Sequence, residues 1–238
     1  MKRSRLLLLA TPFLPLLVAL PGGRWLFPLV APLALYPAFR ERVVARDWRA
    51  AWGLAMLWAF LLSAGVVILT LARPEVAAAG ILNGEPYREE MFGWIATGEG
   101  READWRAFLP QHLLHLAAFL LLTYVSGGYL GLALGAALVA YMSYFVGSYA
   151  AASGAPLLGA LAAWVPWSVV RVAAFVLLGC LLARPLLVRR PWPFDRREAR
   201  LFALAGAGIL ADVLLKALLA RPYGRFLREL ARGILLGG

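Results

Sequence analysis

The sequence has little charge, one cysteine and two histidines, and each scarcity excludes a class of protein. Charged residues make up 16% of the 238 positions and hydrophobic residues 62%, and the mean hydropathy is +0.75. Because soluble domains carry about 25% charged residues, this composition excludes an ordinary soluble fold and indicates a polytopic membrane protein. The lone Cys180 excludes an intramolecular disulfide and a metal site built from several cysteines.

Acids are also scarce, and the formal net charge is +11. The basic residues stand in short clusters between apolar runs, which is typical of the cytoplasmic loops of membrane proteins. Base-reading modules need a polar, soluble face, and the sequence offers none. We therefore expect the lipid bilayer as a partner and no nucleic acid.

The apolar runs predict an all-α polytopic membrane fold with about six transmembrane helices, at residues 6–20, 25–39, 50–71, 111–125, 129–150 and 167–188. The first two runs are short for a bilayer that needs about 20 residues, and we interpret them as an uncleaved hairpin whose helices are extended by flanking residues or are partly re-entrant. A seventh run, 201–219, contains Asp212 and Lys216. These two lie one helical turn apart and can neutralise each other, so a seventh span stays open.

The distribution of basic residues predicts the orientation of one integral membrane domain, residues 1–238. Thirteen Lys and Arg residues fall in three segments that alternating crossings place on one side, and five fall on the other side. The positive-inside rule puts the N-terminus in the cytoplasm of a bacterial-type inner membrane and the loop 73–111, with short interfacial helices, outside. The basic, amphipathic tail 221–238 is predicted to lie on the anionic inner leaflet.

Three glycines, Gly127, Gly131 and Gly135, recur every fourth position. On a membrane helix this spacing makes a face that permits close backbone approach. The face packs either within one protomer or in a homodimer interface.

The outer loop concentrates the acids, because seven of the thirteen Asp and Glu residues lie between Glu75 and Asp104. Pro86 and the spacing of the following apolar residues predict a helix over 86–96, with Glu89 and Glu90 in its first turn. The helix dipole alone favours acids there. A functional interpretation makes Glu85, Glu89 and Glu90 part of a site.

The only histidines, His112 and His115, stand three residues apart and so share a helix face. Two neutral imidazoles there predict a metal site, with Glu89 or Glu90 as a third ligand. The alternative is a structural pair that donates hydrogen bonds to loop carbonyls. No cofactor can be named from the sequence.

Arg171 is an isolated cation in the apolar run 157–183. An ionisable residue inside a membrane marks a functional site by default. We expect its partner among the outer-loop acids Glu85, Glu89 and Glu90, either in a binding site or in a structural ion pair.

One short stretch resembles a known family. Glu89 and Glu90, followed by Phe108 and His112 in an FxxxH spacing, resemble the first two motifs of the membrane-embedded proteases related to CAAX processing enzymes. The resemblance implies that Glu89, Glu90 and His112 are catalytic. The chain lacks the arginine expected after the paired glutamates and any later histidine for the third motif.

Two smaller fragments also carry resemblances. Residues 152–154 resemble part of the loop of the rhomboid serine proteases, but the histidine of a later helix is absent. Lys216, Arg221 and Pro222 resemble the first motif of the phosphatidic-acid-phosphatase class, with a shorter spacing and no histidine after it. The sequence is assigned to none of these families.

Two functions are compatible with the sequence. The first is a transport, binding or assembly component that recognises a solute, lipid or partner through the outer Glu/His cluster. The second is a membrane-embedded hydrolase, either a glutamate/histidine protease or a metal-dependent enzyme. A hydrolase needs a complete set of acid, base and electrophilic groups, and the set recognisable here is incomplete, which favours the first function.

Overall fold

The computed structural model describes residues 8–191 and 194–236, and side chains as far as residue 231. These residues form helices joined by turns, with no strand among them. The elements are η1 (Thr11–Ala19), α2 (Gly23–Val30), η2 (Ala31–Ala34), α3 (Tyr36–Val44), α4 (Trp48–Ala72), α5 (Pro74–Gly80), α6 (Gly84–Thr97), α7 (Trp105–Ser126), α8 (Tyr129–Ala152), α9 (Pro156–Ala163), α10 (Pro166–Leu187) and α11 (Arg196–Leu236).

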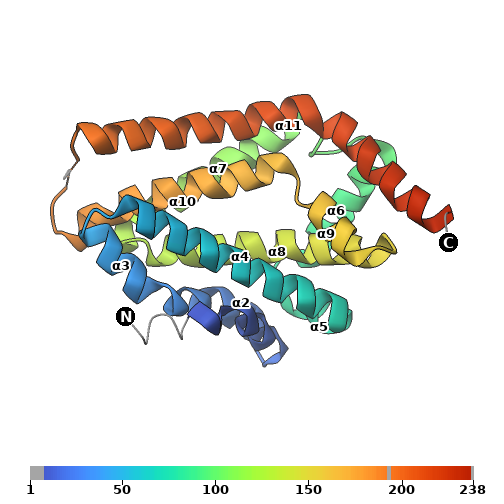
Figure 1. The fold of residues 1–238 in the computed structure, drawn as a ribbon, viewed down its shortest axis with the longest axis horizontal. Helices are drawn as coiled ribbons and strands as arrows, with labels where there is room; N and C mark the ends of the chain where they lie inside the picture. Colours follow the sequence, from blue (N-terminus) through green and yellow to red (C-terminus); the bar gives the residue numbers. More distant parts are fainter. Residues whose placement is uncertain (1–7, 192–193, 237–238) are drawn as a thin grey trace.

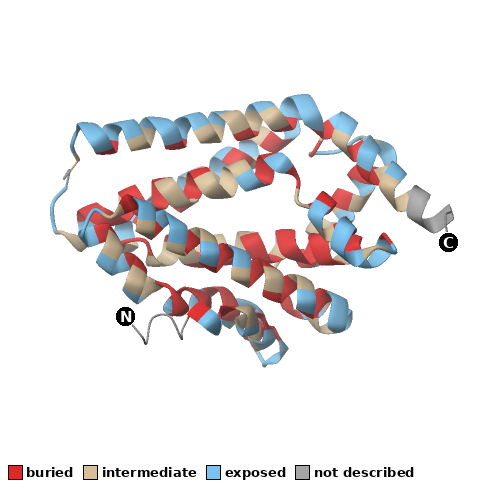
Figure 2. Ribbon diagram, in the orientation of Figure 1, coloured by how far each residue is buried: buried red, intermediate tan, exposed pale blue. Residues whose placement is uncertain are grey.

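Five helices of the described chain, α4, α7, α8, α10 and α11, are long and apolar enough to cross a membrane. They lie side by side in Figure 1, with α3 and the α10–α11 connection at one end and α5, α6 and α9 at the other. Helix α8 is central, with 61% of its most apolar window buried, whereas only 17% of that of α11 is buried. Figure 2 shows the outer face of α11 exposed, and that face carries Leu204, Leu210, Leu214 and Leu218.

The prediction of two continuous N-terminal membrane helices is wrong for the described residues. The first run forms a 3-10 helix with a proline inside it, and the second is divided into α2, η2 and α3. Proline lacks the N–H needed for a helix ladder and clashes with the preceding turn, so prolines at Pro28, Pro32 and Pro37 keep the second arm from becoming one helix. Residues 1–7, where the first run begins, lie outside the described residues.

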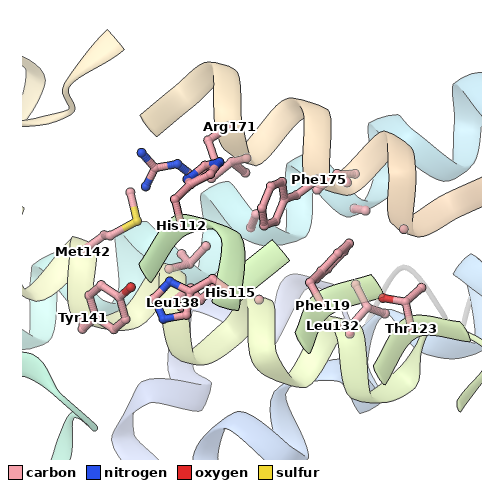
Figure 3. Close-up of a pocket in the computed structure, with 18 of the residues that line it drawn as sticks. His112, His115, Phe119, Thr123, Leu132, Leu138, Tyr141, Met142, Arg171 and Phe175 are labelled. Carbon is pink, nitrogen blue, oxygen red and sulfur yellow. The ribbon is translucent and has the colours of Figure 1, made fainter. Parts of the chain in front are cut away.

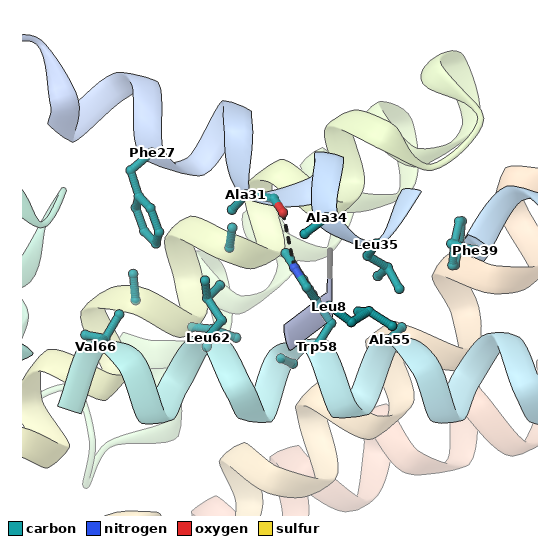
Figure 4. Close-up of a cluster of buried hydrophobic side chains, with 14 of the residues drawn as sticks. Leu8, Phe27, Ala31, Ala34, Leu35, Phe39, Ala55, Trp58, Leu62 and Val66 are labelled. Atoms are coloured by element: carbon teal, nitrogen blue, oxygen red, sulfur yellow. Dashed lines mark hydrogen bonds between the residues drawn. The ribbon is translucent and has the colours of Figure 1, made fainter. Parts of the chain in front are cut away.

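The broken arm is nevertheless packed tightly on α4. The indole N–H of Trp58 donates a hydrogen bond of 3.2 Å to the carbonyl of Ala31, at the junction of α2 and η2 (Figure 4). Phe27, Leu35 and Phe39 of the same segment are buried in one hydrophobic cluster with α4. The segment therefore belongs to the main hydrophobic core and is not a peripheral anchor.

Residues 201–219 lie inside α11, which continues into the predicted tail as far as Leu236. The guanidinium of Arg228 donates to the carbonyl of Ile95 at 2.6 Å, and the Tyr149 hydroxyl donates to the carbonyl of Leu227 at 2.7 Å. These contacts place the described part of the tail beside α6, the helix of the predicted outer loop. The prediction that the tail and the 73–111 loop lie on opposite sides of the membrane is therefore wrong, because α11 runs the length of the bundle and ends beside α6.

The predicted glycine face is also wrong. Of the three glycines, Gly127 lies in the turn after α7 with a φ of 60°, and the other two, Gly131 and Gly135, lie on α8. A Cβ on Gly131 would stand 2.0 Å from the Thr123 hydroxyl, so this glycine permits close packing of α7 on α8 within one chain. The homodimer has no support from this spacing.

The predicted helix over 86–96 is confirmed as α6, which buries Met91, Trp94 and Ile95 in a second hydrophobic cluster with α8 and α11. Helix α7 begins at Trp105, six residues before the predicted start. The carboxylate of Asp104 caps it by accepting from the N–H of Arg106 at 2.9 Å. The early start brings Phe108 and Gln111 onto the same helix as both histidines.

Candidate ligand-binding cavity

A cavity of about 130 Å³ lies between α4, α6, α7, α8, α10 and α11. This is roughly ten times the volume that a single buried water requires. Its wall is polar at one end and apolar at the other. The polar end carries Tyr87, Glu90, Arg101, Glu102, Gln111, His112, His115, Tyr141, Arg171 and Lys216.

Arg171 of α10 and Asp212 of α11 form the first ion pair at the polar end. The guanidinium donates through Nε and Nη2 to the two carboxylate oxygens, each at 2.9 Å. The Asp212 side chain is 1% exposed and that of Arg171 24% exposed. Two parallel hydrogen bonds fix the orientation of the guanidinium relative to the carboxylate, and the opposite charges strengthen both bonds.

His112 lies against the same carboxylate. Its Nε2 is 3.5 Å from Oδ2 of Asp212, without the geometry of a hydrogen bond, and it has no hydrogen-bond partner among the described residues. The residue is 7% exposed. A buried polar atom without a partner is costly unless a ligand or water completes it.

Glu102 and Lys216 form the second buried ion pair. The Lys216 ammonium lies 2.6 Å from one carboxylate oxygen of Glu102, and the Trp167 indole N–H donates to the other at 2.9 Å. The ammonium also stands 4.3 Å from the centre of the Phe108 ring, within cation–π range. The loop before α7 is thus tied to both α10 and α11.

Glu90 and Arg101 lie at the edge of the cavity. Arg101 Nη1 is 3.9 Å from Glu90 and donates to the Gln111 side chain at 3.2 Å. Burial raises the pKa of Glu90 above its ordinary value, although the nearby Arg101 charge opposes this. Glu90 is therefore a carboxyl group that accepts a proton more readily than an exposed glutamate.

The apolar end runs along α7, α8 and α10. Figure 3 shows Phe119 and Thr123 of α7 near Leu132 of α8, with Phe175 of α10 on the same side as Phe119 and with Leu138 of α8 beside His115. Lining residues on α8 extend from Met142 to Gly131, which corresponds to about 16 Å at 1.5 Å per residue. The cavity is therefore long and narrow, with its charges at one end.

The structure brings four of the predicted site residues together: Glu90, His112, His115 and Arg171 all line the cavity. It leaves out two. Glu89 is exposed and is not in the wall. Glu85 accepts a hydrogen bond from the Tyr144 hydroxyl and lies 2.6 Å from Arg88, away from the cavity.

Two predicted pairings are wrong. Arg171 pairs with Asp212 and not with an acid of the outer loop. Asp212 and Lys216 do not neutralise each other, because each points to a different neighbouring helix or loop. Their spacing of four residues places both on the α11 face that meets the cavity, and this is the signal from which the site could have been found.

Three residues of the site were not identified as site residues from the sequence: Asp212 and Lys216, which were recognised only as charges within an apolar run, and Glu102. The predicted metal site gains no third ligand. Within residues 8–191 and 194–236, no group of three or more His, Cys, Asp or Glu side chains could hold a metal ion. The cavity is therefore described by its ion pairs and its apolar arm.

Comparisons with protein-family models, curated proteins and solved structures found no match for this chain.

Proposed function

We propose that this chain is a multi-pass membrane protein that binds an amphiphile in the cavity, with the polar part of the ligand beside Arg171 and Lys216 and its hydrocarbon part along α7 and α8. One observation carries the proposal: a single narrow cavity joins buried ion pairs to an apolar arm. The whole cavity, polar end included, extends about 16 Å along α8, which matches one leaflet of a hydrocarbon core about 30 Å thick. This function is a specific form of the binding component expected from the sequence.

We also propose that the chain lies in a bacterial-type inner membrane with α6 outside and the α3 end in the cytoplasm. The basic segments around Arg46 and the start of α11 support this, because Arg46 pairs with Asp195 at 3.1 Å and with Glu198 at 3.2 Å. Both segments thus meet at one end of the bundle. The positive-inside rule assigns such an end to the cytoplasm.

The orientation predicts the reactivity of single cysteines at two exposed positions, Thr97 and Arg196. An impermeant thiol reagent applied to intact cells should label Thr97→Cys and should label Arg196→Cys only after the membrane is opened. Cys180 is fully buried and can be replaced by alanine as background. If position 196 alone is labelled in intact cells, the orientation is the opposite of the one proposed.

Binding of the hydrocarbon chain is tested by filling the apolar arm. Gly135 lines the cavity, and a Cβ added there meets no atom within 4 Å. Gly135→Leu should therefore fold normally and weaken the binding of palmitic acid and hexadecanol, measured in detergent by displacement of a fluorescent analogue, by at least about tenfold.

Gly53→Leu is the matched control. Gly53 is an exposed helical glycine of α4 outside the cavity wall, with equally open space around its Cβ. This variant should bind both probes as the unmodified protein does. Equal binding of both probes by the Gly135 and Gly53 variants, or no binding of either probe by the unmodified protein, would contradict the proposed function.

A membrane-embedded hydrolase is the second candidate. What favours it is that Glu90, with a raised pKa, and His112 line one cavity. A carboxyl group and an imidazole can act as general base and acid towards a bound ester or amide. Turnover of a palmitoyl ester that is lost in Glu90→Gln, while palmitate binding persists, would establish this candidate over simple binding.

A further inference from the structure

We infer that the ligand is a single-chain amphiphile with an anionic head group, a carboxylate or a phosphate monoester, held by Arg171 and Lys216. This inference rests on the proposed amphiphile binding and adds the chemical class of the ligand. It follows from unused hydrogen-bond donors, from the position of the counter-charges and from the width of the apolar arm.

Both cations keep donors beyond their buried partners. A guanidinium has five N–H donors, and those of Arg171 at Nε and Nη2 reach Asp212. An ammonium has three, and Lys216 makes one carboxylate contact and faces an aromatic ring. Among the described residues no other acceptor is bonded to either cation, so both can donate into the cavity.

The charges of the wall favour an anion. Arg101, Arg171 and Lys216 line the cavity, against two carboxyl groups, Glu90 and Glu102. Asp212 is fully buried behind Arg171 and is not part of the wall. A ligand at the polar end therefore meets the cation first, and its own negative charge is stabilised at short range in a site of low dielectric.

His112 supplies a second, independent indication of a polar ligand. Its Nε2 is buried without a hydrogen-bond partner in the described chain, and its side chain lies next to Arg171 at the polar end (Figure 3). An oxygen of a carboxylate or phosphate placed between these two residues would accept from both. Head groups without an acceptor would leave the imidazole nitrogen unsatisfied.

The apolar arm admits one chain only. The whole cavity, polar end included, has a volume of only about 130 Å³ and extends about 16 Å along α8. The rings of Phe119 and Phe175, 5.1 Å apart between centroids, line the arm, and Gly131 and Gly135 line it without side chains. Two acyl chains side by side would not fit.

The inference is tested with a series of probes that share one chain. Palmitic acid, hexadecyl phosphate, hexadecanol and hexadecylamine are compared by displacement of a fluorescent analogue from the full-length protein in neutral detergent, with acetate and inorganic phosphate as anions without a chain. The two long-chain anions should bind at least about tenfold more tightly than hexadecanol, and the amine and the short anions should not compete.

The double variant Arg171→Gln/Asp212→Asn tests whether Arg171 causes the preference for anionic head groups. It removes both charges of the pair, so no buried charge is left without its partner. It should lose the preference for anions, so that palmitic acid and hexadecanol bind with similar affinity. If hexadecanol or hexadecylamine binds the unmodified protein as tightly as palmitic acid, and Gly135→Leu still abolishes this binding, the anionic class is wrong while amphiphile binding stands. If no probe is sensitive to Gly135→Leu, the proposed function itself fails.

Discussion

Replacing Asp212 with alanine is expected to lower the free energy of unfolding by about 3–5 kcal/mol, the cost of leaving a buried cation without its partner. Arg171 is 24% exposed, and its guanidinium donates two hydrogen bonds, each of 2.9 Å, to the carboxylate of Asp212. The measurement is unfolding in mixed detergent micelles, followed by circular dichroism.

The double variant Asp212→Leu/Arg171→Met separates loss of the pair from loss of packing. It removes both charges together, so it should recover most of the stability lost in Asp212→Ala. A double variant as unstable as the sum of the two single variants would mean that the pair contributes no coupling. The same double variant leaves Glu102 and Lys216 in place, which keeps α11 attached to the loop before α7.

The second large effect is expected at Glu102. Its replacement by alanine leaves the Lys216 ammonium and the Trp167 indole N–H buried without a carboxylate, and the expected loss is again about 3–5 kcal/mol. Glu102→Gln retains an acceptor for the indole and should lose clearly less. Both are measured by the same unfolding assay.

Glu99 offers a matched control in the same loop, because it is exposed and three residues before Glu102. Glu99→Ala should change the free energy of unfolding by no more than about 0.5 kcal/mol. An equal loss for Glu99→Ala and Glu102→Ala would contradict the buried network and would attribute the effect to the loop sequence as a whole.

The helical class and the two helices α4 and α8 could be predicted from the sequence, because apolar runs longer than about 18 residues are a local property of the chain. The run at 50–71 corresponds to α4, and the run at 129–150 to α8. The N-terminal hairpin could not be predicted in the same way. Its hydropathy resembles that of a span, but its prolines break the hydrogen-bond ladder and leave short helices that depend on packing against α4.

The candidate site could be predicted in part. The two histidines and the isolated Arg171 were recognisable because ionisable residues are rare in this chain. Glu90 and Glu89 could not be distinguished from the sequence, since both occupy the same turn of α6. Only the packing of that helix on α8 turns one of them towards the cavity and the other outwards.

By itself the sequence determined the helical, strongly apolar character of this protein and the few positions where a charge interrupts it. The tertiary structure alone decided which charges meet. Asp212 pairs with Arg171, 41 residues earlier, and not with Lys216 one turn away. Asp212 and Lys216 are neighbours on α11, but each meets an opposite charge from a different element. Arg171 of α10 and Glu102 of the loop before α7 are buried with them and provide the better partners.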